Sequence, residues 1–69
     1  MEIKAEMAAT VWKIEVSEGD TVSPGDVIMI LESMKMEIPI EAEDAGTVTR
    51  IPVAPGDSIE EGQLLAQLD

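Results

Sequence analysis

Short runs of alternating apolar and polar residues recur along the chain, and none has the 3.6-residue period of an amphipathic helix. In residues 12–16, three apolar side chains alternate with charged ones, and residues 36–41 and 50–54 show a similar alternation. A period of two is typical of β-strands with one buried face. We therefore predict strands in these segments, with the only aromatic residue, Trp12, facing the core.

Turn signals separate these segments from two further apolar ones. Gly-Asp pairs occur at 19–20 and 56–57, each followed two residues later by a β-branched side chain. Glycine recurs at positions 25 and 62, and beyond these glycines lie the apolar segments 27–31 and 64–68. Turns at this spacing predict about eight short strands.

The chain also contains an internal repeat. Residues 7–32 align without a gap onto residues 44–69 at an offset of 37, with 9 identities in 26 positions. Two copies are too few for a solenoid, so we predict one domain, residues 1–69, built from two similar halves. Short strands related by a pseudo-two-fold axis close as an all-β fold, a flattened barrel or small sandwich.

The longest stretch without Gly or Pro that could be helical is residues 26–38, and it lacks a polar helical face. We therefore divide it into two strands that meet within residues 32–37, which read Glu-Ser-Met-Lys-Met-Glu. A two-residue turn at Met34 and Lys35 would place Glu32 opposite Glu37, and like charges in such a pair are unfavourable. Tight hairpin turns also favour Asn or Gly at the positions that Met34 and Lys35 occupy. Local rules broken together in this way are typical of a functional site.

The repeat also predicts where this hairpin lies. Its equivalent falls near the chain ends, after Leu68 and Asp69, so a two-fold relation puts Lys35 at the pole opposite the termini. A group attached to Lys35 would then point away from the chain ends. Pro39 cannot donate a ladder hydrogen bond, so we expect it on an edge strand or pointing outward.

Composition narrows the function. The 69 residues include neither cysteine nor histidine, which removes disulfides, thiolate metal sites and the usual general base. We therefore predict that the chain is not an enzyme by itself. The net charge of −11 argues against nucleic acid or anionic membranes as partners, because phosphate binding needs clustered Lys and Arg. No apolar run approaches the length of about 20 residues that a membrane helix needs, and no signal peptide is visible, so we expect a cytoplasmic protein.

Lys35 has the features of a modification substrate and lacks those of a catalyst. A nucleophilic lysine is activated by burial or by nearby positive charge, whereas Glu32 and Glu37 favour the charged ammonium form. An external enzyme would have to deprotonate Lys35 and present an activated acyl group. Elsewhere, Glu41, Glu43 and Asp44 could suggest a weak calcium site, but without the spacing of a known calcium loop a solvated acidic loop is the better interpretation.

The triplet Met34-Lys35-Met36, preceded by the small Ser33, resembles the attachment site of biotinyl domains, and the resemblance covers essentially the whole chain. The chain is similar to free-standing biotin/lipoyl attachment proteins and to the biotin carboxyl carrier domains of carboxylases. This resemblance implies a barrel-sandwich hybrid of two four-stranded antiparallel sheets, with the modified lysine on a hairpin tip. Many relatives have Ala at the position of Ser33.

The same resemblance implies a function and partners. Lys35 would carry covalent biotin, added by a biotin protein ligase that recognises Met34 and Met36 together with the flanking residues Glu32, Ser33 and Glu37. The biotin would then shuttle a carboxyl group between biotin carboxylase and carboxyltransferase subunits or domains. The alternative is a lipoyl carrier, or a dual acceptor, modified on the same lysine; the methionines favour biotin because lipoyl sites usually read Asp-Lys-Ala. A third hypothesis is a docking module in which Lys35 stays a free amine.

Overall fold

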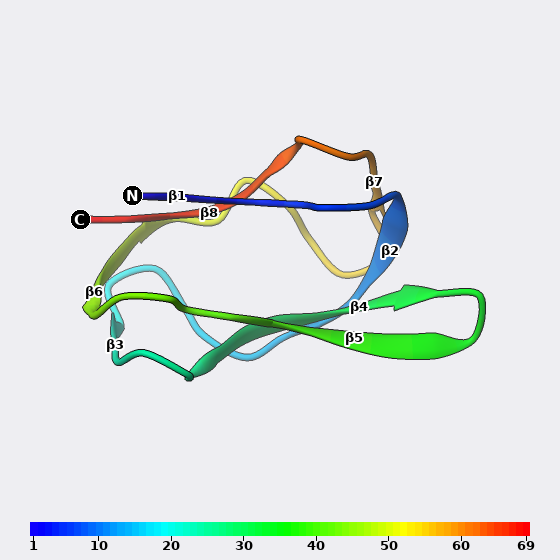
Figure 1. Ribbon diagram of the computed structural model, residues 1–69. Helices are drawn as coiled ribbons and strands as arrows, with labels where there is room; N and C mark the ends of the chain where they lie inside the picture. Colours follow the sequence, from blue (N-terminus) through cyan, green and yellow to red (C-terminus); the bar gives the residue numbers. More distant parts are fainter.

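The computed structural model describes residues 1–69 and consists of eight strands joined by turns, with no helix (Figure 1). The strands form two four-stranded antiparallel sheets, with the orders β1-β8-β6-β3 and β5-β4-β2-β7. Accordingly, no helix is present that could cross a bilayer. The strand bounds are β1 Glu2–Lys4, β2 Ala9–Ile14, β3 Thr21–Val22, β4 Val27–Ser33, β5 Met36–Glu41, β6 Gly46–Arg50, β7 Ser58–Ile59 and β8 Leu64–Leu68. The all-β prediction and the two-sheet architecture are confirmed.

The sequence repeat corresponds to a structural repeat. Each strand has a repeat equivalent, offset by about 37 residues, that occupies the same position in the other sheet. The equivalent pairs are β1 and β5, β8 and β4, β6 and β2, and β3 and β7. The contacts between the halves are reciprocal, because the Gly19 amide donates to the Val48 carbonyl and the Gly56 amide to the Val11 carbonyl, both at 2.7 Å. The two halves are therefore related by a pseudo-two-fold axis, as the alignment predicts.

The core is a single cluster of 14 buried residues, all apolar, drawn from both halves. Its most buried members are Ile28 and Met29 in β4 and their repeat equivalents Leu65 and Ala66 in β8, each 0% exposed. Full burial of a large aliphatic side chain contributes about 1.5–3 kcal/mol. Because β4 and β8 are inner strands of the two sheets, these residues hold the sheets together.

The prediction that Trp12 lies in the core is wrong. Val11 pairs with Leu31 and Lys13 with Ile30, so β2 carries one extra residue, Trp12, at this point. This β-bulge interrupts the in-and-out alternation, and the Trp12 side chain is 48% exposed. The Lys13 amine lies 5.9 Å from the centre of the indole ring, which places both side chains on the outer face.

Two strand boundaries also differ from the sequence pattern. The strand expected over residues 12–16 corresponds to β2, which begins earlier and ends at Ile14. The strand expected over residues 50–54 is wrong beyond its first residue, because β6 ends at Arg50; Pro52, without an amide proton, cannot continue the ladder. The pattern did not predict β1, which is only three residues long and is defined by its pairing with β8. Pro39 lies in β5, an edge strand, so that prediction is confirmed.

Candidate functional site

Strands β4 and β5 form a hairpin that projects from the rest of the molecule, with its tip on the side opposite the two termini (Figure 1). Strand β4 is the longest strand, with seven residues, and β5 and β2 follow with six residues each. Lys35 lies in the turn that joins them. The predicted position of Lys35, at the pole away from the chain ends, is confirmed.

The turn holds two side chains in a backbone conformation that such residues rarely adopt. Ser33 pairs with Met36 and Glu32 with Glu37, leaving Met34 and Lys35 as a two-residue loop. Their φ angles are 53° and 66°, the signs of a type I′ turn. All other positive-φ residues in the chain are glycines. Non-glycine residues in this region cost about 1–3 kcal/mol each, so the strain of the backbone is concentrated at Lys35 and its neighbour.

The side chains around the turn are open to solvent. Met34 is 92% exposed and Met36 is 66% exposed, the two highest values among the large hydrophobic residues of the chain. Successive strand residues point to opposite faces, so Met36 and Ser33 continue the inward face of Leu31, which is buried. Met36 thus extends an apolar face beyond the core, where a partner can contact it.

The Lys35 amine is free of ion pairs. The two ion pairs of the structure join Lys4 to Glu2 and Lys13 to Glu15, each at 3.5 Å. The carboxylates that flank the turn, on Glu32 and Glu37, face each other across the strand pair but form no salt bridge with Lys35. An acylating enzyme would therefore have no internal contact of the amine to break.

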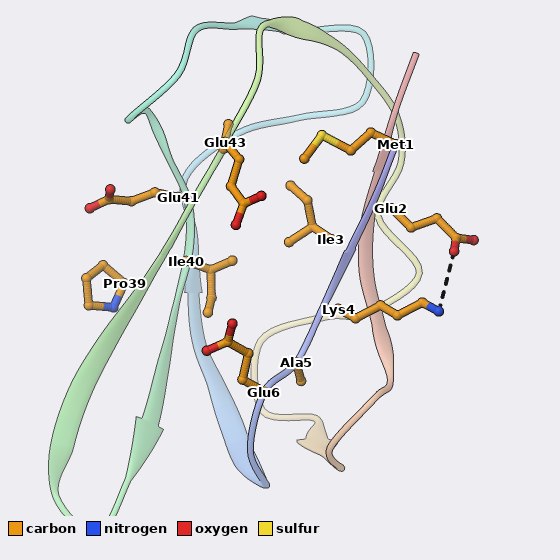
Figure 2. Close-up of a pocket in the computed structure, with 11 residues that line it drawn as sticks. Met1, Glu2, Ile3, Lys4, Ala5, Glu6, Pro39, Ile40, Glu41 and Glu43 are labelled. Atoms are coloured by element: carbon orange, nitrogen blue, oxygen red, sulfur yellow. Dashed lines mark ion pairs between the residues drawn. The ribbon is translucent and has the colours of Figure 1, made fainter.

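The one groove in the structure does not include this turn. It is lined by residues 1–6 and 39–43, which are repeat-related segments facing each other across the open edge between β1 and β5 (Figure 2). Glu6 and Glu43 point into it, whereas Pro39 and Glu41 point away. None of the six residues predicted for the site lines this groove. No group of three or more acidic side chains is placed to hold a metal ion.

The site predicted from the sequence is therefore an exposed turn and contains no cavity. The fold keeps its six residues together on one hairpin tip: Glu32, Ser33, Met34, Lys35, Met36 and Glu37. In a comparison with known families, the family model described as "Biotin-requiring enzyme" matches residues 1–68. The chain belongs to the biotin/lipoyl family.

Relatives within this family include both biotin and lipoyl proteins. The biotinylated protein TB7.3 homolog of Mycobacterium leprae is 54% identical over 39 residues, which is 56% of this chain and 55% of the relative. The alignment thus spans about half the length of the curated relatives that it matches. The urea carboxylase of Kluyveromyces lactis superposes with a TM-score of 0.93 at 33% identity, covering 100% of this chain and 6% of that enzyme.

A lipoyl protein has nearly the same fold. The lipoyl domain of the 2-oxoglutarate dehydrogenase complex from Azotobacter vinelandii superposes with a TM-score of 0.86 at 27% identity, covering 100% of this chain and 95% of that domain. The backbone fold is therefore common to both kinds of carrier. The choice between the two groups has to rest on the side chains at the turn.

Proposed function

We propose that residues 1–69 form a biotin carboxyl carrier domain whose Lys35 is biotinylated by a biotin protein ligase in the cytoplasm. The observation that carries this proposal is the strained, exposed turn, in which Lys35 and Met34 are the only non-glycine residues with positive φ. Strain of this kind persists where it serves a function. In the acylation, the Lys35 amine loses a proton and forms an amide as the activating group leaves the acyl carbon.

The chain's own residues present the lysine and identify it to the ligase. The I′ turn fixes the direction of Lys35, and the exposed side chains of Met34 and Met36 give the ligase an apolar surface to read. Glu32, Ser33 and Glu37 complete the recognised hairpin tip. When bound, biotin would carry a carboxyl group between biotin carboxylase and carboxyltransferase partners. The chain contributes no catalytic residue of its own to this transfer.

The residues present fit biotin. The site offers an amine without an ion pair on a tip that no other element covers (Figure 1), as a long covalent arm requires. The methionines on both sides of Lys35 favour biotin over lipoate. A lipoyl carrier is the second candidate, supported by the close superposition with a lipoyl domain, and it would use the same lysine.

Mass analysis after incubation with each ligase tests the proposal. The protein is incubated with biotin, ATP and a biotin protein ligase, and separately with lipoate, ATP and a lipoyl ligase, then digested with trypsin. Unmodified protein is cut after Lys35 and yields residues 14–35 and 36–50. Acylation of Lys35 blocks that cut and leaves residues 14–50 with the added mass of the acyl group.

The digest contains its own controls, because cleavage after Lys4 and Lys13 should continue in every arm. Biotin on residues 14–50 supports the carboxyl carrier. Lipoate alone on that peptide transfers the assignment to the lipoyl carrier. Cleavage after Lys35 in both arms would falsify the assignment of Lys35 as the attachment site. The hypothesis of a docking module with a free Lys35 amine would then remain.

A further inference from the structure

The outer face of the sheet that carries Lys35 has an apolar row, formed by Trp12, Ile30 and Pro39. Pro39 of β5 pairs with Ile30 of β4, and Ile30 pairs with Lys13 of β2, next to the bulged Trp12. Pro39 points away from the interior of the sandwich (Figure 2). Trp12 is nearly half exposed and is the only aromatic residue of the protein.

The repeat provides an internal comparison for this row. At an offset of 37, the equivalents of Trp12, Ile30 and Pro39 are Thr49, Gln67 and Glu2. They occupy the same places on the backbone: Glu2 pairs with Gln67, Gln67 pairs with Arg50, and a register shift falls at Thr49 as it does at Trp12.

At these paired positions the two halves differ in the side chains on the outer face. The inward positions remain apolar in both, as shown by Val11 with Val48 and by Leu31 with Leu68, each 3% exposed or less. The outward row is polar in one half and apolar in the other on the same backbone. The fold therefore does not require apolar side chains at Trp12, Ile30 and Pro39, and exposed apolar side chains gathered in one place mark an interaction surface.

The location of the row indicates which partner it contacts. Pro39 is four residues from Lys35 along β5, or about 13 Å at 3.3 Å per residue. A standard interface covers about 800 Å² on each protein, which corresponds to a disc of about 16 Å radius. An enzyme that takes the Lys35 amine into its active site therefore also covers this row. Enzymes that act on the group attached to Lys35 bind it at a greater distance from the row.

We propose that Trp12, Ile30 and Pro39 form the docking surface for the biotin protein ligase that acylates Lys35. The chain as a whole carries a net charge of −11, and the outward carboxylates of Glu32 and Glu37 lie between the row and the turn. The complementary ligase surface is an apolar recess with a basic rim. This inference rests on the proposed function, because it takes Lys35 as the acceptor.

The experiment transfers the polar residues of one half to the other. The double variant Trp12→Thr with Ile30→Gln carries the residues found at Thr49 and Gln67, which the same backbone already accommodates. Biotinylation rates are measured against protein concentration with purified ligase and saturating biotin and ATP. We expect kcat/KM to fall about tenfold, mainly through KM, as is typical when an aromatic anchor of an interface is lost.

A matched control changes the other face. Thr49→Ala with Gln67→Ala should leave kcat/KM within about twofold of the unsubstituted protein, since surface substitutions outside an interface have small effects. Circular dichroism and thermal unfolding establish that each variant is folded. Trp12→Thr alone is the second variant, to be used if the double variant unfolds.

A competition assay measures binding without the chemistry. The Lys35→Arg protein, which cannot be acylated, should inhibit biotinylation of the unsubstituted protein, and adding Trp12→Thr to it should raise the inhibitory concentration about tenfold. Equal inhibition by the two proteins overturns the docking surface. So does an unchanged biotinylation rate in the double variant, even if its later carboxylation is impaired. If the unsubstituted protein itself takes no biotin, the proposed function fails instead.

Discussion

At one end of the sandwich, β4 continues into β5 through the Met34-Lys35 turn, while at the other end the equivalent strands β8 and β1 pair without a turn between them (Figure 1). Met1 and Leu68 exchange backbone hydrogen bonds of 2.7 and 2.8 Å, as the equivalent residues of the hairpin pair in register.

This difference separates what the fold needs from what the hairpin adds. Residues 32–37 form two strand pairs and a turn, and none of the six residues is buried. The core is therefore complete without them. Their exposed apolar side chains and strained backbone do not stabilise the core. The tip can therefore be specialised for recognition by a partner.

The strongest test of this separation removes the proposed acceptor amine alone. Lys35→Arg keeps the charge and the turn, so biotin incorporation should be lost completely while the free energy of unfolding changes by less than about 0.5 kcal/mol. Incorporation is measured by intact mass, and stability by urea unfolding. Lys4→Arg, in the strand equivalent to β5, is the control and should retain full incorporation. Biotin on the Lys35→Arg protein would refute the assignment.

A second test compares equivalent core positions at the two ends. Leu31→Ala and Leu68→Ala each remove a buried side chain, 1% and 3% exposed, and each should lower the free energy of unfolding by about 2–5 kcal/mol. Met36→Ala, on the same inward face but beyond the core, should cost less than about 0.5 kcal/mol. Urea unfolding followed by circular dichroism measures all three. A large loss for Met36→Ala would show that the hairpin tip belongs to the core.

Relieving the backbone strain of the turn should stabilise the domain. Met34→Asn with Lys35→Gly introduces the pair that type I′ turns favour, so the free energy of unfolding should rise by about 1–2 kcal/mol. The matched control is Gly19→Ala, at a φ of 97°, which should destabilise because it introduces strain of the same kind. If the Asn-Gly protein is no more stable than the original, the positive φ values at Met34 and Lys35 carry no strain.

The smallest expected effect concerns the facing carboxylates. Glu32→Gln removes the like-charge pair with Glu37 and should stabilise the domain by a few tenths of a kcal/mol at low salt. The gain should shrink at about 1 M salt, where the screening length falls to about 3 Å. Glu60→Gln, an exposed acidic residue outside the hairpin, is the control. A gain that is independent of salt would rule out charge repulsion as its cause.

Much of this molecule could be predicted from local patterns. The apolar segments 27–31 and 64–68 and the alternation over residues 36–41 predicted β4, β8 and β5. The Gly-Asp turns and the 37-residue offset predicted the two related halves and the hairpin at Lys35. These features depend on short stretches of chain, because a turn or a half-buried strand is encoded by a few neighbouring residues. The pairing of Glu32 with Glu37 followed from the length of the turn alone.

Tertiary structure decided the features that depend on a partner strand. Strand β1 exists because β8 offers it hydrogen bonds, and the outward position of Trp12 follows from one extra residue in β2 opposite β4. A bulge leaves no mark in the period of a single strand, since register is a property of two strands. The sequence therefore determined the halves, the turn and the place of Lys35 in that turn. The pairing of the strands decided which apolar side chains the core buried and which it left exposed.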